Sequence, residues 1–376
     1  MAAATVGVIG GGQLAWMMAG VAPKLGINLV VQTPSAQDPA VSIASDAIFA
    51  AIDDAAATGQ LATRCDVITF ENEFINLEAL TKLAQQGICF RPHLEALSPL
   101  LDKYNQRCYL QEIGLPVPQF LAVSDYNSSQ SHFGFPVVLK ARRHGYDGRG
   151  TFIIQQQEEL EEFCSRLETD NLMLEEYVPF ERELAVMAAR STTGEVVVYP
   201  VVETEQKNQV CHRVIAPAQI SLQIKEQVLE IARTLLEKLQ VVGIFGIELF
   251  LTSQGQVLVN EIAPRTHNSG HFTLDACDIS QFEMHLRAVA GLPLTEPMLL
   301  CAGAIMVNLL GYENSQSDYA VKRQKIATIP QAFVHWYGKT ESRLGRKLGH
   351  VTVLLNPEQI AESASIAQKV ESLWYG

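Results

Sequence analysis

Two glutamates in neighbouring apolar segments have the residue type and spacing of a metal site. Glu248 lies in the first segment, Glu261 lies in the second, and a short polar stretch separates them. If Gln254 and Gly255 form the two-residue turn of a hairpin, the two glutamates face each other across the ladder. Carboxylates so placed repel each other unless a cation lies between them, and Mg²⁺ binds carboxylates together with nucleotide phosphates. An exposed acidic hairpin is the alternative, which the apolar surroundings of both acids disfavour.

A lysine and a glycine-rich segment could bind nucleotide phosphates. Lys140 ends an apolar stretch, and residues 145–150 (Gly-Tyr-Asp-Gly-Arg-Gly) follow it. The lysine would meet phosphates as a point charge while the amides of the glycine segment cover them. No Gly-Lys-Ser/Thr sequence opens a helix here, so the segment is not a P-loop. A solvated hairpin with an exposed lysine is the alternative, and three glycines among six residues argue against it.

Two further segments offer groups for a nucleotide and an anion. The acid-rich residues 174–184 could border an adenine ring with main-chain groups and supply an acid for ribose hydroxyls. Residues 265–271 (Arg-Thr-His-Asn-Ser-Gly-His) gather a guanidinium, two imidazoles, an amide and a hydroxyl just beyond Glu261. Because such clusters beside a metal site are more often functional than structural, we interpret this one as an anion cradle.

A glycine-rich turn follows the first apolar segment. Residues 10–15 (Gly-Gly-Gly-Gln-Leu-Ala) fit the G-x-G-x-x-A fingerprint of dinucleotide-binding proteins. The second apolar segment ends without the acid that a dinucleotide ribose requires, since the first acid beyond it is Asp38. We therefore predict a loop for a phosphate or another polar ligand at a helix N-terminus. A plain tight turn is the alternative.

The elements that must position these residues follow from hydrophobic periodicity. Residues 5–9, 27–31, 66–70 and 88–90 read as strands that alternate with helices, which predicts a parallel, doubly wound sheet in an α/β domain. Ligands of such sheets bind at the carboxyl ends of the strands. Later helices are predicted over residues 103–113 and 221–240, the second with a clear apolar stripe.

Composition limits the possible partners. With 376 residues the chain can form two or three domains, and its net charge of −13 argues against a nucleic acid or an anionic membrane as partner. The longest apolar stretch is too short to span a bilayer, and the N-terminus lacks the basic region of a signal peptide. The seven cysteines show no CxxC spacing, which is typical of reduced thiols and a cytoplasmic location.

Taken in this order, the motifs resemble the ATP-grasp superfamily, and within it the family of 5-(carboxyamino)imidazole ribonucleotide synthases. The match covers essentially the whole chain, and residues 260–271 are its most specific part. Other matching motifs lie at residues 10–14, 69–73, 145–150, 275–277, 280–283, 337–339 and 345–347. The resemblance implies an N-terminal Rossmann-like domain (1–98), an ATP-grasp domain (99–295, lid about 117–178) and a small strand-rich C-terminal domain (296–376).

The resemblance also implies a reaction. Bicarbonate would be activated by ATP as carboxyphosphate and would carboxylate 5-aminoimidazole ribonucleotide in de novo purine biosynthesis. The enzyme would use Mg²⁺, or Mn²⁺ in its place, and no biotin. It would be a homodimer that could hand its unstable product to a downstream mutase.

Site residues follow from the same resemblance. Metal ligands would be Glu248 and Glu261. Catalytic residues would be Lys140, Tyr146, Asp147, Arg265 and His271. ATP would contact Lys103, Lys140, Gly145, Tyr146, Asp147, Gly148, Arg149, Gly150, Thr151, Glu175, Glu176, Tyr177, Val178, Glu183, Gln206, Asn260 and Glu261. The ribonucleotide would contact Gln13, Leu14, Glu73, Tyr146, Asp147, Arg149, Arg265, His267, Asn268, Ser269, Lys339, Arg346 and Lys347. The chain departs from the family pattern at Lys103 (usually arginine), Gln206 (usually histidine) and Thr266 (usually proline).

Three alternatives have different signatures. Another ATP-grasp ligase, such as a formate-dependent transformylase or a biotin carboxylase, would show a different acceptor in a substrate screen. An NAD-dependent oxidoreductase built on residues 10–15 would bind nicotinamide nucleotides. A catalytically inactive ATP-grasp module would bind ATP without turnover, although the intact Lys140, Glu248 and Glu261 argue against it.

Overall fold

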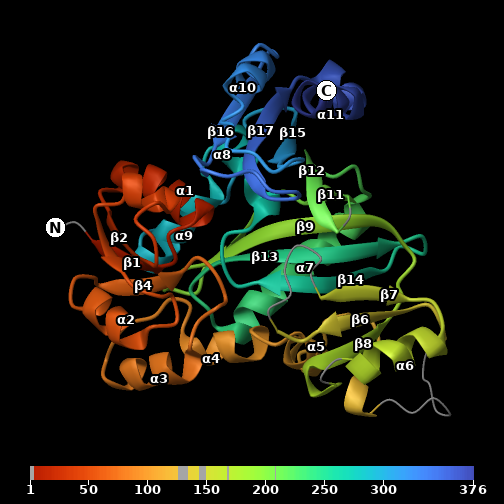
Figure 1. Ribbon diagram of the computed structural model, residues 1–376, viewed down its shortest axis with the longest axis horizontal. Coiled ribbons are helices and arrows are strands. Elements are labelled where there is room, and N and C mark those ends of the chain that lie inside the picture. Colours follow the sequence, from red (N-terminus) through yellow and green to blue (C-terminus); the bar gives the residue numbers. More distant parts are fainter. Residues whose placement is uncertain (1–3, 126–133, 144–149, 167–168, 208) are drawn as a thin grey trace.

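The described part of the chain folds into three sheets, as the computed structural model in Figure 1 shows. The structure describes residues 4–125, 134–143, 150–166, 169–207 and 209–376. The N-terminal sheet is parallel with the order β3-β2-β1-β4. Its strands are β1 (Thr5–Ile9), β2 (Asn28–Thr33), β3 (Asp46–Phe49) and β4 (Val67–Phe70), and its helices are α1 (Gln13–Val21), α2 (Ala55–Ala62), α3 (Leu77–Gln85) and α4 (Leu94–Leu97).

This sheet confirms the predicted parallel arrangement, with two differences. The predicted strands at residues 5–9, 27–31 and 66–70 are present within one or two residues, whereas β3 and α2 were not predicted. The predicted strand 88–90 is reduced to a single bridge between Ile68 and Phe90. Pro92 lies two residues after Phe90, and since proline has no N–H to donate, it cannot extend a ladder.

A small antiparallel sheet forms a separate layer with its own core. Its order is β5-β8-β6-β7, and α6 (Gln157–Arg166) accompanies it. Leu139, Ile154, Leu160 and Leu174 pack together inside it. Its strands are β5 (Phe120–Ala122), β6 (Val137–Ala141), β7 (Thr151–Ile154) and β8 (Leu172–Glu176).

The third sheet has nine strands and runs through the rest of the chain. Its order is β14-β13-β9-β11-β12-β15-β17-β16, with β10 paired to β9. Since β12 pairs with β15, the strands after residue 296 continue the central sheet instead of forming a sheet of their own. The strands are β9 (Phe180–Arg190), β10 (Val196–Val198), β11 (Val202–Lys207), β12 (Val210–Ala216), β13 (Gly243–Thr252), β14 (Val257–Ala263), β15 (Gly303–Leu310), β16 (Ala332–Trp336) and β17 (Lys347–Leu355).

Helices cover this sheet and connect it to the N-terminal domain. The helix predicted at 221–240 is confirmed as α7, capped by the Ser221 side chain, and its apolar stripe is buried against the sheet. The remaining α-helices are α5 (Lys103–Glu112), α7 (Leu222–Leu239), α8 (Thr273–Ala276), α9 (Gln281–Ala290), α10 (Ala320–Ala327) and α11 (Ser363–Tyr375). Within the described residues, no helix combines the length and the apolar character that a bilayer span requires.

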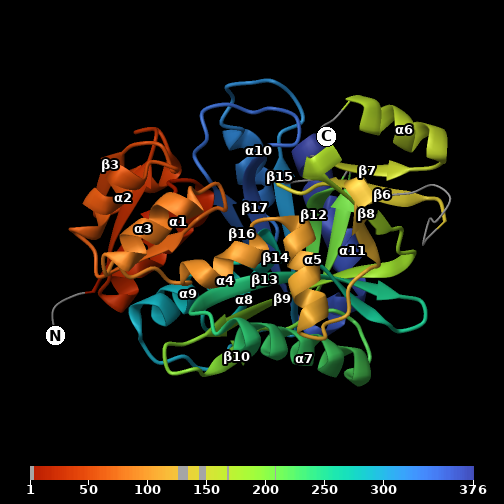
Figure 2. The same cartoon turned by 90° about the horizontal axis from the view of Figure 1, so that it is seen from below.

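Helix α9 joins the N-terminal sheet to the central sheet (Figure 2). Its buried His285 accepts a hydrogen bond at Nδ1 from the main-chain N–H of Ile244 on β13, at 3.2 Å. The ring proton is therefore on Nε2, which lies 2.8 Å from Thr69 Oγ1 on β4 and donates to it. Glu283 of the same helix pairs with Lys24, at 2.7 Å. The two domains that border the cleft are thus held by polar contacts as well as by packing.

We expect His285 to make the fold sensitive to acid. Burial lowers the pKa of its imidazole from 6.5 to about 4. Between these values the unfolded chain binds a proton that the folded chain does not bind, so stability is complete above pH 6.5 and falls as the pH drops toward 4. At pH 5 the expected loss is about 2 kcal/mol. Urea unfolding of the parent and of His285→Gln should show their stability difference narrowing by this amount between pH 7.5 and pH 5; a constant difference would contradict the assignment.

Candidate functional site

A cleft of about 2250 Å³ lies where the three sheets meet. From the predicted ATP set it is lined by Lys103, Lys140, Thr151, Glu175, Glu176, Tyr177, Val178, Glu183, Gln206, Asn260 and Glu261. Glu248 and, from the predicted ribonucleotide set, Gln13, Leu14, Glu73, Arg265, His267, Asn268, Lys339, Arg346 and Lys347 also line it. Gly150, Ser269 and His271 do not line it. Gly145, Tyr146, Asp147, Gly148 and Arg149 lie outside the described residues.

The predicted pairing of Glu248 with Glu261 is confirmed, but the turn is not the predicted one. Thr252 N–H bonds to the Gln256 carbonyl at 3.0 Å across a three-residue loop, with Gly255 at φ 77°. This loop shifts the register by one residue. A bulge at Asn260, which has no partner opposite it between the Glu248–Glu261 and Leu249–Val259 pairs, shifts it back.

Helix α5 fixes the outer edge of β14 on both sides of Glu261. The side-chain amide of Gln106 accepts from the Ile262 N–H (3.0 Å) and donates to the Ile262 carbonyl (3.3 Å). Arg107 donates to the carbonyl of the bulged Asn260. These groups complete the hydrogen bonds of an edge strand. Neither residue was predicted; the only available signal was their place on the helix that begins with Lys103, and both are 3% exposed.

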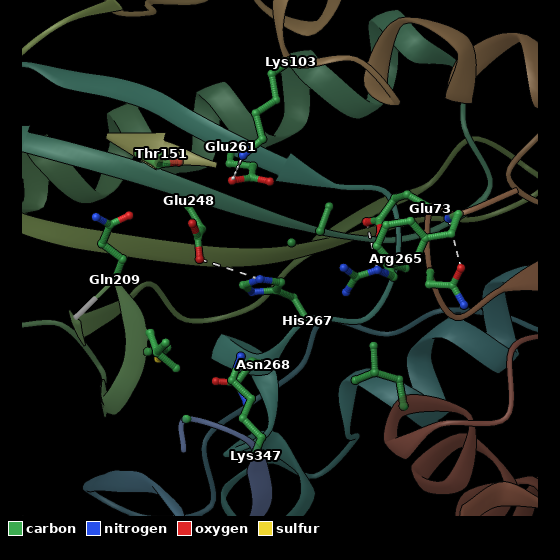
Figure 3. Close-up of a pocket in the computed structure, with 18 of the residues that line it drawn as sticks. Glu73, Lys103, Thr151, Gln209, Glu248, Glu261, Arg265, His267, Asn268 and Lys347 are labelled. Atoms are coloured by element: carbon green, nitrogen blue, oxygen red, sulfur yellow. Dashed lines mark hydrogen bonds and ion pairs between the residues drawn. The ribbon is translucent and has the colours of Figure 1, made fainter. Parts of the chain in front are cut away.

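The charges around the glutamate pair suit a divalent cation. Desolvation in the cleft, the nearby Glu261 and the nearby Glu183 raise the pKa of Glu248 to about 8. Desolvation also acts on Glu261, but Lys103 (Nζ to Oε2, 3.1 Å) and Lys140 lower its pKa overall. Among the described residues no lysine or arginine pairs with Glu248 as Lys103 pairs with Glu261, and a hard cation between the two carboxylates would supply positive charge to both. Figure 3 shows both carboxylates on the same side of the hairpin, with Lys103 above Glu261.

Lys140 belongs to a buried charge cluster at the end of β6. Its ammonium pairs with Glu175, and Arg107 pairs with the other oxygen of the same carboxylate. Burial raises the pKa of the Glu175 carboxyl, but the two cations lower it more strongly. Together they bring this pKa to about 2. Lys140 Nζ also lies 3.3 Å from Asn260 Oδ1. Two cations and one carboxylate give the cluster a net charge of plus one beside the cleft. Because both oxygens of the Glu175 carboxylate pair with these cations, we expect its main chain, not its side chain, to border a base.

The opposite end of the cleft is rich in cations. Arg265 Nε lies 2.9 Å from Glu73 Oε1, so a residue of the N-terminal domain orients the guanidinium. Lys339 Nζ donates to Gln13 Oε1 at 3.0 Å and to the Lys347 carbonyl at 2.6 Å, which joins the first and the last domain. Arg346 and Lys347 line the same wall. Figure 3 shows His267 between Glu248 and this end, with its Nε2 3.7 Å from Glu248 Oε1.

The glycine loop at residues 10–12 holds a side chain of the protein itself, Glu71, whereas Gln13 and Leu14 just after it line the cleft, so the polar-ligand role of this segment stays a prediction. Leu14 N–H donates to Glu71 Oε1 at 3.3 Å, and Glu71 therefore occupies the anion position at the N-terminus of α1. A Cβ at Gly12 would lie 2.5 Å from the same oxygen, and a Cβ at Gly11 would lie 2.5 Å from Thr33 Oγ1. The glycines allow this close approach. Because the Glu71 side chain occupies the position at the N-terminus of α1 that a dinucleotide pyrophosphate would need, the dinucleotide interpretation does not hold.

His271 is a core residue in this structure. It is 0% exposed, its Nδ1 accepts from Gln281 at 3.0 Å, and burial lowers its pKa well below the usual value. Because it does not reach the cleft, we assign it no direct contact with reacting atoms. Its ring lies 5.1 Å from that of His350, which stacks on His335 at 4.5 Å and 13°.

The nearby polar cluster is a poor metal site despite its composition. Ligand atoms of Asp275, His335 and His350 lie within 4.8 Å of one another. The two imidazoles are stacked nearly parallel, so their nitrogen lone pairs run side by side instead of converging on one ion. His335 Nε2 instead contacts Asp275 at 2.9 Å, and His350 Nδ1 contacts the Tyr337 hydroxyl at 2.8 Å. We therefore interpret the cluster as a structural network behind the cleft.

Comparison with known protein families assigns the three parts of the chain. Residues 3–99 match the ribonucleotide synthetase preATP-grasp domain, residues 108–282 the ATP-grasp domain, and residues 304–364 the phosphoribosylaminoimidazole carboxylase C-terminal domain. The chain is 54% identical to the N5-carboxyaminoimidazole ribonucleotide synthase of Synechococcus elongatus, over 98% of this chain and 95% of that protein. It is 52% identical to the protein of that name from Synechocystis sp., over 99% and 98%.

Solved structures agree over the whole length. The N5-carboxyaminoimidazole ribonucleotide synthetase of Thermotoga maritima superposes with a TM-score of 0.87 at 41% identity, covering 98% of both chains. The N5-carboxyaminoimidazole synthase of Aspergillus clavatus, in complex with ADP and 5-aminoimidazole ribonucleotide, gives a TM-score of 0.90 at 30% identity, over 100% of this chain and 99% of that one.

Proposed function

The chain belongs to the N5-carboxyaminoimidazole ribonucleotide synthase family of ATP-grasp ligases, and on that premise we propose how its residues perform the reaction. It is an ATP-dependent ligase that carboxylates 5-aminoimidazole ribonucleotide in purine biosynthesis. The observation that carries our residue assignment is the order of charges along one cleft: Lys103 and Lys140, then the Glu248–Glu261 pair, then Arg265.

The lysine end binds ATP. Lys103 and the net positive cluster around Lys140 contact the phosphates as point charges. The main chain of residues 175–178 borders the adenine. Glu183 faces the ribose hydroxyls, and burial raises the pKa of its carboxyl to about 7, so that it can donate as well as accept near neutral pH.

Glu248 and Glu261 hold Mg²⁺, or Mn²⁺ in its place, with Asn260 beside them. When bound, the cation supplies positive charge to the transferring phosphoryl group. The fit rests on two carboxylates that face each other across the hairpin, with the ammonium of Lys103 beside Glu261. Lys103 keeps Glu261 ionised and oriented before the cation arrives.

Arg265 holds the carbon substrate. A bicarbonate oxygen attacks the γ-phosphorus of ATP and ADP departs, which gives carboxyphosphate. The bond between its carbonyl carbon and the bridging oxygen then breaks and releases phosphate. The amine of the ribonucleotide attacks that carbon, forms the N–C bond and loses a proton. The guanidinium, oriented by Glu73, offers the planar two-point contact that a carboxylate accepts.

Water exclusion by residues 145–150, including Tyr146, Asp147 and Arg149, remains a prediction.

The test of this function is ADP release from Mg-ATP, with and without the ribonucleotide and bicarbonate. We expect release to require the ribonucleotide and labelled bicarbonate carbon to enter an acid-labile product. ADP release that ignores the ribonucleotide would point to another acceptor, and nicotinamide-dependent activity would return the oxidoreductase alternative.

Arg346 tests the position of the ribonucleotide phosphate. It lines the cationic wall, and its Nη1 donates to the Glu341 carbonyl at 2.8 Å. For Arg346→Ala we expect the KM for the ribonucleotide to rise about tenfold, the effect of one lost phosphate contact, and the KM for ATP to stay within about twofold. Arg323→Ala is the matched control, because Arg323 pairs with Asp318 outside the cleft. Equal increases in both KM values would mean that the phosphate binds elsewhere.

Assembly and location complete the proposal. We propose a homodimer, which light scattering would test, and a cytoplasmic location, which the seven free thiols support. The carbamate product is labile, and direct transfer to a mutase that moves its carboxyl group would protect it.

A further inference from the structure

We propose that two buried amides outside the cleft, Gln281 and Asn308, are positioning residues that hold His267 and Asn268 in place for the ribonucleotide. The proposal rests on the proposed function, together with the contact between Asn268 and the ribonucleotide that the family resemblance implies. Both amides are 0% exposed, and they come from different parts of the chain, α9 and β15. They act on the segment that follows β14.

Gln281 clamps the main chain of His267 at two points. Its Oε1 accepts from the His267 N–H at 2.9 Å, and its Nε2 donates to the His267 carbonyl at 2.7 Å. Because a main-chain N–H only donates and a carbonyl only accepts, the amide has one possible orientation. Its second N–H reaches His271 Nδ1 at 3.0 Å. The buried His271 thus accepts the remaining N–H of the Gln281 amide.

Asn308 clamps the side chain of Asn268. Its Nδ2 donates to Asn268 Oδ1 at 2.7 Å and to the Cys211 carbonyl at 2.9 Å, while its Oδ1 accepts from Asn268 Nδ2 at 3.0 Å. The Cys211 carbonyl fixes the orientation of the Asn308 amide, and the Asn308 amide then fixes that of Asn268. Asn308 is the one polar residue of β15, a strand buried along its whole length, so a polar side chain there requires an explanation.

Two glycines clear the space in which the segment sits. A Cβ at Gly246 of β13 would lie 2.5 Å from His267 Cβ. A Cβ at Gly270 would lie 2.6 Å from Gln281 Oε1. The absence of a Cβ at these two positions therefore lets the segment lie close to β13 and to the Gln281 amide.

The consequence is a preformed contact for the substrate. After pairing with Asn308, the Asn268 amide keeps one N–H and one lone pair, and the residue lines the cleft beside Lys347 (Figure 3). Without the clamp, Asn268 could adopt other rotamers, and binding would have to order it. Misplacement by about 1 Å can cost about a hundredfold in rate.

A double-mutant cycle tests the proposal. We expect Asn308→Leu to raise the KM for the ribonucleotide about tenfold or more, with the KM for ATP within about twofold. Asn268→Ala should give a similar rise, and the double variant should be no worse than Asn268→Ala alone, because Asn308 acts through Asn268. Thr352→Val is the matched control: it removes a buried hydroxyl on the neighbouring strand β17, and its kinetics should equal those of the parent.

Each failure has its own signature. If Asn268→Ala leaves the ribonucleotide KM unchanged, the proposed substrate contact is wrong and the positioning role falls with it. If Asn268→Ala raises this KM but Asn308→Leu does not, or if the effects add in the double variant, the contact stands and the positioning role is overturned. Should Asn308→Leu not fold, Asn308→Asp keeps the volume but loses both donated bonds, and Gln281→Met removes the other clamp. Either should raise the ribonucleotide KM selectively, and equal effects on both substrates would overturn the proposal.

Discussion

Replacing Glu261 with alanine is expected to lower kcat/KM by roughly 10³-fold or more, the order of loss when one stabiliser of transition-state charge is removed. The change leaves Glu248 as the only carboxylate of the pair and deprives Lys103 of its partner at 3.1 Å. The cation would then be held by one carboxylate and phosphates alone. The measurement is ADP release at saturating ribonucleotide over a range of Mg²⁺ concentrations.

Two variants make this result specific. Glu261→Asp keeps the charge but shortens the reach, so its activity should partly recover as Mg²⁺ or Mn²⁺ is raised, whereas Glu261→Ala should not recover. Glu205→Ala removes a glutamate of the same sheet that pairs with Arg213 outside the cleft, and it should stay within about twofold of the parent. Activity of Glu261→Ala within a few-fold of the parent would refute the metal assignment.

The glutamate pair shows what the sequence could and could not reveal. An assumed two-residue turn at Gln254 and Gly255 placed Glu248 opposite Glu261, and the structure agrees with that pairing. The turn and the bulge were missed, and their two one-residue shifts cancel. The bulge at Asn260 depends on Arg107 and on the segment that follows α5, where the Pro116 carbonyl accepts from Val259 N–H at 2.8 Å. Such partners are distant in sequence, so local periodicity does not show them.

Other residues of the site also depend on partners that are distant in sequence. The glycines at 10–12 correctly indicated an open backbone, but the group that fills it, Glu71, lies 57 residues beyond Leu14. His271 was assigned from the family resemblance and from its place in the cluster 265–271, whereas in the structure it is buried against Gln281 on another helix. Arg107 was missed because a charged residue on a helix usually faces water; its burial depends on Glu175 and Asn260.

Domain organisation also separates features that local sequence patterns predict from those that depend on distant strands. The parallel N-terminal sheet and helix α7 could be predicted because each is set by its own local pattern. The boundary near residue 296 stays a prediction, but the sheet continues across it: β15 pairs with β12, nearly a hundred residues earlier, and no local pattern shows that pairing. This continuity matters for the site, since it places Asn308 beside Asn268 and Lys347 on the cleft wall.

Replacing Arg265 with lysine, which keeps the charge, is expected to lower kcat by about 10²- to 10³-fold, with the KM for ATP changed less than about threefold. Glu73 forms an ion pair with the guanidinium at Nε, and Nη1 donates to the Thr266 carbonyl at 3.0 Å. Among the described residues no other hydrogen bond engages this guanidinium, so it can offer N–H groups to a carboxylate. An ammonium is a point charge that cannot keep Glu73 and offer two parallel donors. Single-turnover transfer of labelled bicarbonate carbon to the ribonucleotide measures the affected step.

Two comparisons show whether the loss comes from geometry at the carbon substrate. Arg287→Lys, the matched control, alters an arginine that pairs with Glu283 at 2.8 Å away from the cleft, and its activity should match the parent. Glu73→Gln keeps the size of the residue that orients Arg265 and removes its charge, so it should reduce carbon transfer without weakening ADP binding. If Arg265→Lys retains parental activity, charge alone suffices at this position and the two-point contact is wrong. If ADP binding falls in step with carbon transfer, Arg265 instead belongs to the nucleotide end of the cleft.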